Sequence, residues 1–183
     1  MSEVWNKVYK SDSSFFGEKP SNFALLCFNH MKADNSKKVL ELGAGHGRVT
    51  LFFASNGIAV DALDYSAIAV EILDKIAKEK GLPIKTQIFD VNNSFPFPDD
   101  YCNAVYSHML LNMRFSLHEL HFIFSEIRRV LKSKGLNFFS VRNHNDKSYR
   151  KDMEVDKGIY DVNGFRVRFF TEKEIRDLAK QEG

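Results

Sequence analysis

The chain of 183 residues is predicted to form one α/β domain, a doubly wound, mostly parallel sheet with helices on both faces. Short apolar runs alternate with longer segments whose apolar residues recur at helical spacing, which is typical of parallel α/β folds. Three glycines at alternate positions, Gly43, Gly45 and Gly47, follow the first apolar run, 39–42. Such a turn lets the backbone approach a ligand closely, because no Cβ atom stands in the way.

The expected elements follow in regular order up to about residue 142. Strands are expected at 39–42, 58–63, 84–89, 101–107 and 136–141. Helices are expected at 20–33, at 48–56, between the cap Ser66 and Gly81, and at 117–131, which Ser116 caps and Gly135 ends. A polar loop at 92–100 separates the third strand from the fourth.

The later sequence is less regular. Residues 144–164 are polar and contain two glycines, so no element is assigned to them. Residues 165–169 alternate like an exposed or edge strand. Thr171 and Glu174 form a capping box that opens a last helix to about residue 181.

A carboxylate marks the end of each of the first two strands. Glu41 stands two residues before Gly43, and Asp64 stands 21 residues after it. The latter position is where a Rossmann-like βαβ unit places the carboxylate that binds ribose hydroxyls. In a dinucleotide fingerprint the third glycine comes one residue later than Gly47 does, and a carboxylate such as Glu41 suits a cationic ammonium or sulfonium group. The pattern therefore favours a nucleoside ligand that carries positive charge.

The run Glu-Leu-Gly-Ala-Gly-His-Gly at 41–47 resembles the first motif, E/D-x-G-x-G-x-G, of class I S-adenosylmethionine (SAM) methyltransferases. The resemblance covers about 37–142 and is to the small-molecule branch, which includes the tellurite-resistance type. It implies a helical cap at 1–36, a cofactor-binding core at 37–142, and a substrate-side segment with the last helix at 143–183. The antiparallel strand pair that usually completes the family's sheet is missing. We therefore expect a truncated sheet whose far edge is exposed or covered by a partner.

The resemblance also implies which residues bind the cofactor. The glycine turn and Glu41 would hold the methionine part, Asp64 the ribose, and Asp90 the adenine amino group. The full predicted set is Glu41, Gly43, Ala44, Gly45, Gly47, Asp64, Tyr65, Asp90, Val91 and Ser107.

His108 and Tyr9 are the candidates for a catalytic group. His108, at the carboxyl end of the fourth strand, is the candidate general base because histidine side chains titrate near neutrality, although a histidine between apolar neighbours is as often a core residue. Tyr9 belongs to an aromatic N-terminal segment that would fold over the cofactor or would simply pack the first helix on the sheet. The candidate substrate contacts are Phe16, Arg142, Asn143 and Tyr149, with Arg166 as a further cation for an anionic group.

Other classes of function find little support. A formal charge of +2 without a basic run argues against nucleic acid, and no apolar stretch reaches the roughly 18 residues of a membrane span. Two isolated cysteines and the lack of a signal-peptide pattern indicate the cytoplasm. His118 and His121 have no obvious third ligand, so no metal is expected. The fourth strand ends in Ser-His-Met-Leu and not in the Asn/Asp-Pro-Pro-aromatic motif of adenine or glutamine methylation.

These observations favour a SAM-dependent methyltransferase that acts on a small-molecule acceptor as a monomer or homodimer and yields S-adenosylhomocysteine. Two alternatives remain open. A SAM-binding module or regulator without catalysis would keep every cofactor residue. An NAD-dependent oxidoreductase would share the glycine turn and Asp64, but the early third glycine and Glu41 count against it.

Overall fold

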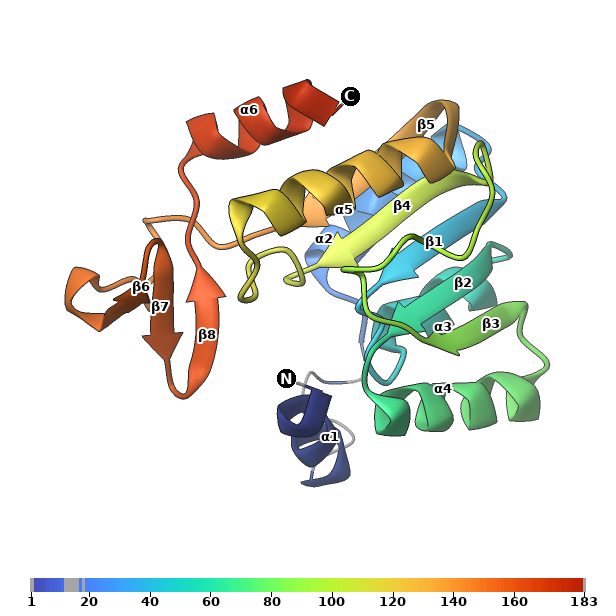
Figure 1. The fold of residues 1–183 in the computed structure, drawn as a ribbon. Helices are drawn as coiled ribbons and strands as arrows, with labels where there is room; N and C mark the ends of the chain where they lie inside the picture. The colour runs from blue at the N-terminus through green and yellow to red at the C-terminus, as the bar shows by residue number, and fades with distance from the viewer. Residues whose placement is uncertain (1, 12–16, 18, 183) are drawn as a thin grey trace.

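The centre of the computed structural model, which describes residues 2–11, 17 and 19–182, is a five-stranded parallel sheet (Figure 1). The strands lie in the order β3-β2-β1-β4-β5. Their bounds are β1 Lys38–Leu42, β2 Ala59–Asp64, β3 Ile84–Ile88, β4 Cys102–His108 and β5 Leu131–Ser140. The chain winds outward from β1 to β3 and then returns to the other side of β1 with β4. In such a sheet the ligand crevice opens at the carboxyl ends of the strands, beside this reversal.

Helices cover both faces of the sheet, as the sequence predicts (Figure 1). One face carries α2 Asn22–Ala33, α3 Arg48–Ser55 and α4 Ala67–Lys80, and the other carries α5 Leu117–Val130 and α6 Glu172–Glu182. Alternate residues of each strand supply the two cores. In β1, for example, Leu40 and Leu42 pack towards α5, whereas Val39 packs towards α2 and α3.

Most helices begin at the caps that the sequence marks, and α4 also ends at its predicted glycine. The side chain of Ser21 caps α2, and Ser66 caps α4, which ends at Gly81 in the left-handed conformation. Ser116 and Glu119 form a complete capping box at the start of α5. Thr171 and Glu174 form the predicted reciprocal hydrogen bonds at the start of α6.

The predicted start of the fifth strand is wrong. β5 begins at Leu131, directly after α5, and Gly135 lies inside the strand and does not end the helix. The physical reason is a bulge. Cys102 pairs with Leu131 but Ala104 pairs with Leu136, so the intervening residues of β5 bulge out of the ladder. The polar residues of this bulge hide the strand from an analysis of apolar periodicity.

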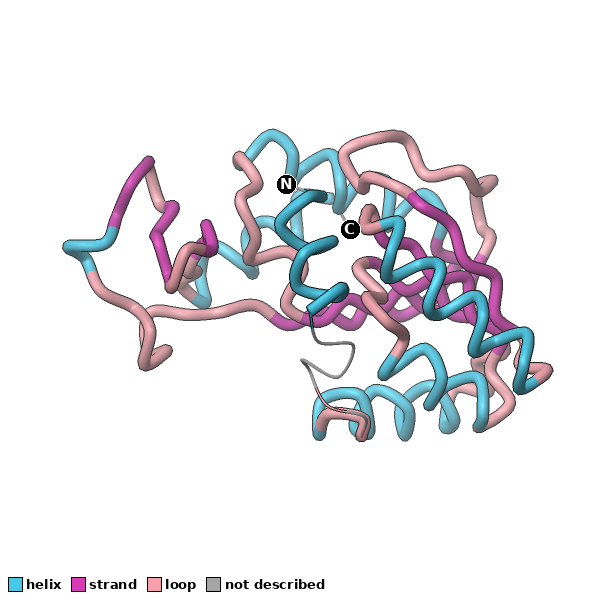
Figure 2. Tube along the Cα trace, turned by 90° about the horizontal axis from the view of Figure 1, so that it is seen from below, coloured by secondary structure: helices cyan, strands magenta, loops and turns pink. Residues whose placement is uncertain are grey.

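A second, antiparallel sheet follows β5, and two of its three strands lie in the region that the sequence leaves without an element. It consists of β6 Glu154–Asp156, β7 Ile159–Val162 and β8 Phe165–Arg168, preceded by the 3₁₀ turn η1 Lys151–Met153. Figure 2 shows these strands well separated from the main sheet. Asn163 (φ 53°) and Gly164 (φ 84°) join β7 to β8, a pair of positive φ angles typical of a two-residue hairpin turn. β8 is an edge strand, as predicted, and the described part of the main sheet has no antiparallel pair.

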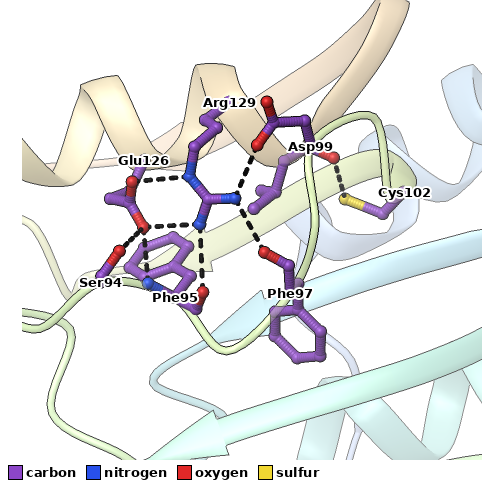
Figure 3. Close-up of polar contacts among 8 residues, drawn as sticks. Ser94, Phe95, Phe97, Asp99, Cys102, Glu126 and Arg129 are labelled. Atoms are coloured by element: carbon purple, nitrogen blue, oxygen red, sulfur yellow. Dashed lines mark hydrogen bonds and ion pairs between the residues drawn. The ribbon is translucent and has the colours of Figure 1, made fainter.

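The polar loop between β3 and β4 is fastened to α5 by an ion pair (Figure 3). The carboxylate of Glu126 pairs with the guanidinium of Arg129 at 2.7 Å and also accepts the backbone N–H of Phe95. Arg129 donates to the carbonyl oxygens of Phe95 and Phe97, and it pairs with Asp99 at 3.0 Å. The hydrogen bond from Arg129 is the main interaction that lowers the pKa of Glu126, to about 2. These contacts hold the loop between β3 and β4 against α5.

Among the residues that the structure describes, no helix is long and apolar enough to cross a membrane. No group of three histidine, cysteine or acidic side chains among them is arranged to hold a metal ion.

Candidate functional site

A cavity of about 720 Å³ opens at the carboxyl ends of the strands, and this volume is in the range of about 300–1,000 Å³ common for small-molecule sites. The sheet side of the cavity is formed by the ends of β1, β2 and β4 and by the loops that follow them. The opposite side is formed by α1 (Ser2–Ser11) and by the β7–β8 hairpin, which lie beyond the strand arrowheads in Figure 1. The covering residues are Trp5, Tyr9, Val162, Asn163, Phe165 and Val167.

The loop after β1 has a shape that requires glycine. Gly43, Gly45 and Gly47 have φ angles of 73°, 57° and 92°, in the left-handed region. A Cβ atom at Gly47 would overlap a methyl group of Leu73 in α4, and one at Gly45 would lie 2.6 Å from the hydroxyl of Tyr9. The glycines thus bring α3 close to α4 and bring α1 close to the loop.

Asp64 ties this loop to the start of α4. Its carboxylate accepts the backbone N–H groups of Gly45 and Ser66, both at 2.8 Å, and is only 7% exposed. Burial raises the pKa of this carboxyl group. The hydroxyl of Ser66 in turn donates to Asn6 of α1 at 2.6 Å. One hydrogen-bonded cluster therefore positions the acidic group, the glycine loop and the N-terminal cover.

Glu41 is the second carboxyl group on the cavity. It is buried and accepts the hydroxyl of Thr50 at 2.6 Å. Burial raises its pKa to about 8, although the Thr50 hydrogen bond and the charge of Arg48 act in the opposite direction. A buried carboxyl group beside a ligand cavity is well suited to a cationic ligand, because the cation would stabilise its ionised form.

The segment after β3 supplies a polar edge. Asp90 and Asn92 line the cavity, together with Val91 and Tyr65. Asp90 Oδ1 accepts the backbone N–H of Asn92 at 3.0 Å, which fixes the turn. Asn92 Oδ1 is buried and has no hydrogen-bond partner among the described residues. An unsatisfied buried acceptor on a cavity wall is suited to a ligand N–H group.

His108, at the end of β4, contacts both the cavity and Ser140 of β5. Ser140 Oγ lies 2.6 Å from His108 Nδ1 and accepts the backbone N–H of Met109 at 3.1 Å. The short contact between the Ser140 hydroxyl and Nδ1 fixes the orientation of the His108 ring at the edge of the cavity. Burial and the charge of Arg48 lower the pKa of His108, so the ring is neutral at pH 7.

The N-terminal cover is built from aromatic side chains. Tyr9 is buried against Gly45, and burial raises its pKa, so its phenol remains protonated. Its ring also meets His46 edge to face, with the centroids 5.8 Å apart. Trp5 stacks near Tyr9 and lies 5.3 Å from the ring of Phe165 in β8. The helix and the hairpin therefore contact each other above the cavity.

Most of the predicted site residues whose positions are described gather at this cavity. Those on its wall are Tyr9, Glu41, Gly43, Ala44, Gly45, Asp64, Tyr65, Asp90, Val91, His108 and Arg142. Those off it are Gly47, Ser107, Asn143, Tyr149 and the further cation Arg166. Ser107 is fully buried within β4, Asn143 accepts a hydrogen bond from its own turn, and Tyr149 stacks on His144. Phe16 lies outside the described residues.

Several wall residues were not predicted from the sequence. They include Trp5, His46, Arg48, Asn92, Met113 and the four residues of the hairpin. The Asn-Gly pair at 163–164 between two alternating apolar runs is a hairpin signal that could have placed the last of these. His46 lies within the glycine loop and Arg48 directly after it. Because ligands of such sheets bind at the carboxyl ends of the strands, both residues could have been included in the predicted site.

Comparisons with known proteins agree with this architecture. A family model described as "Methyltransferase domain" matches residues 39–135. The structure of a SAM-dependent methyltransferase from Methanosarcina mazei is 23% identical, with a TM-score of 0.69 over 79% of this chain and 77% of that one. The CcbJ methyltransferase from Streptomyces caelestis is 17% identical, with a TM-score of 0.75 over 97% and 84% of the two chains. The [4+2]-cyclase SpnF is 18% identical, with a TM-score of 0.75 over 100% and 70%. No curated protein sequence gave a significant match.

Proposed function

The chain belongs to the methyltransferase-domain family, and we propose that it transfers a methyl group from S-adenosyl-L-methionine to a small-molecule acceptor, releasing S-adenosyl-L-homocysteine. The observation that carries the proposal is the joint position of Glu41, Asp64 and the glycine loop on one cavity wall. Buried carboxyl groups beside a close-approach backbone suit a nucleoside that bears ammonium and sulfonium charges. Membership in the tellurite-resistance type remains a prediction from the sequence.

The fit of SAM to these residues follows their chemistry. Asp64 is positioned by two backbone N–H groups and keeps lone pairs for ribose hydroxyls. Glu41 supplies a carboxylate for the ammonium group of the methionine part. Asn92 Oδ1, which lacks a partner among the described residues, offers an acceptor for an amino group such as that of adenine. When bound, SAM supplies an electrophilic methyl group on a sulfonium centre.

The cover supports a small acceptor. Trp5 of α1 meets Phe165 of the hairpin, so the cavity is bounded on the side opposite the sheet. An acceptor held under this cover would be oriented towards the methyl group and shielded from water. Such positioning supplies a large part of the rate enhancement in a simple displacement. His108, held in place by Ser140, is the candidate general base for an acceptor that must lose a proton.

The remaining expectations are proposals of the same kind. We propose a monomer or homodimer with no nucleic-acid or membrane partner. We also propose a cytoplasmic location, with which the two buried free thiols, Cys27 and Cys102, are compatible.

The decisive test combines binding and turnover. Calorimetry with SAM, S-adenosylhomocysteine and NAD should show binding of the first two alone; NAD binding without SAM binding would point to an oxidoreductase and end the proposal. S-adenosylhomocysteine release should then be followed over a library of small acceptors. Intact SAM binding with no release on any acceptor would instead favour a binding module without catalysis.

A further inference from the structure

Apart from His46 and Arg48, in and directly after the glycine loop, the acidic and the basic side chains that line the cavity come from different parts of the sheet edge. The acidic residues Glu41, Asp64 and Asp90 come from the ends of β1 and β2 and from the segment after β3. The basic residues His108 and Arg142 come from β4 and from the segment after β5. The strands lie in the order β3-β2-β1-β4-β5 (Figure 1), so the acidic residues belong to the β3-β2-β1 part of this edge and the basic residues to the β4-β5 part.

Arg142, at the basic end, has hydrogen-bonding capacity that the described residues leave unused. Its Nε–H is buried and has no hydrogen-bond partner among them. Its Nη1 pairs with Asp146 Oδ1 at 3.5 Å, longer than the roughly 2.7–2.9 Å of a strong charge-assisted bond. The same oxygen also accepts the backbone N–H of Ser148 at 2.8 Å. Asp146 therefore balances part of the charge of Arg142 without satisfying its guanidinium fork.

The loop after β4 and the hairpin add apolar side chains to the cavity wall. Met113 and Phe115 follow β4, and Val167 belongs to β8. Met113 forms an isolated bridge with Val167, so the loop after β4 and the hairpin are joined there. Surroundings of low polarity strengthen the attraction between a guanidinium and an anion. They also favour a ligand whose body is apolar.

We propose that the methyl acceptor is a small apolar molecule bearing a carboxylate, and that Arg142 binds this carboxylate through its Nε and an Nη. A planar carboxylate matches the guanidinium fork with two parallel hydrogen bonds, and the Nε–H of Arg142 has no partner among the described residues. That the carboxylate belongs to a methyl acceptor rests on the proposed function. The anion site itself follows from the unsatisfied guanidinium on the cavity wall.

The test uses matched probes that differ only in charge. Benzoate, phenylacetate and 3-phenylpropionate are compared with their primary amides by saturation-transfer NMR titration, with and without S-adenosylhomocysteine. We expect at least one carboxylate to bind at least tenfold more tightly than its amide. Arg142→Gln should abolish this preference, and Arg142→Lys, which keeps the charge but not the fork, should reduce it at least threefold. Asp146→Asn should strengthen carboxylate binding, because it removes the competing anion.

Arg166→Gln is the matched control. Arg166 is paired with Asp161 and does not line the cavity, so its variant should keep the preference for carboxylates. Equal binding of every carboxylate and its amide, or a preference that survives Arg142→Gln, would overturn the inference. If Arg142→Gln does not fold, Arg142→Lys and Asp146→Asn decide in its place. Binding of S-adenosylhomocysteine is measured separately, so loss of that binding would count against the proposed function and not against the anion site.

Discussion

Replacing Glu41 with glutamine should change how the stability of the protein depends on pH. Burial raises the pKa of Glu41 from 4.5 to about 8, so between these values the folded chain holds a proton that the unfolded chain has lost. The stability that this proton supports is fully present below pH 4.5 and is lost as the pH rises through about 8. Each pH unit within this window costs up to about 1.4 kcal/mol. A glutamine side chain has nearly the same shape and can still accept the Thr50 hydroxyl, but it does not ionise.

The free energy of unfolding, measured by urea titration from pH 5 to pH 7.5, should therefore fall more steeply for the native chain than for the Glu41→Gln variant. We expect the difference between the two to change by about 2–3 kcal/mol over this range in favour of the variant. Any constant offset from burying the amide N–H₂ group does not affect this slope.

Glu126→Gln is the control for this experiment. The pKa of Glu126 is lowered to about 2, so its contribution to stability is present above the unfolded value and is lost only as the pH falls towards about 2. Between pH 5 and pH 7.5 its variant should run parallel to the native chain. Parallel curves for the native chain and Glu41→Gln as well would mean that Glu41 is ionised throughout, and the reasoning from its burial would fail.

Three further predictions concern the same wall. Binding of SAM near pH 6.5 should release protons from the native chain and fewer from Glu41→Gln, because the cationic ligand stabilises the ionised carboxylate of Glu41. Calorimetry in buffers of different ionisation enthalpy measures the number of protons released, and equal release from the two chains would refute the prediction. Gly47→Ala should lower stability by about 2 kcal/mol or more, whereas Gly81→Ala, also at positive φ but in open space, should lose only about 1 kcal/mol; thermal unfolding compares them. Asp64→Ala should weaken SAM binding by about 1.5–3 kcal/mol. Asp61→Asn should leave the affinity unchanged, because Asp61 accepts the hydroxyl of Tyr101 and does not line the cavity. Unchanged affinity in Asp64→Ala would mean that Asp64 does not hold the ribose.

The two boundaries of α4 and the start of α5 could be predicted because their signals are local. Ser66 and Gly81 cap the two ends of α4, and each does so through hydrogen bonds to residues only three or four positions away. Ser116 and Glu119 likewise bond each other at the start of α5. The start of β5 was missed because its pairing is not local. Leu131 is a strand residue only because Cys102, far away in the sequence, lies beside it.

The hairpin was missed for a different reason. The turn at Asn163 and Gly164 has a strong local signal, but the polar composition of the preceding residues outweighed it. Within β4 the sequence pointed to both Ser107 and His108. Only His108, the last residue of the strand, reaches the cavity, because Ser107 is fully covered inside the sheet.

The two halves of the cavity differ in how the chain encodes them. The glycine loop, Glu41 and Asp64 belong to one compact βαβ unit, so a single stretch of sequence fixes their spacing and hence their ligand. The other half is assembled from α1 at one end of the chain and from the hairpin near the other, and these meet through Trp5 and Phe165. No short motif can describe such a pocket, because its residues become neighbours only after folding. The methyl donor can therefore be predicted from the sequence, whereas the acceptor has to be inferred from the side chains that the fold brings together.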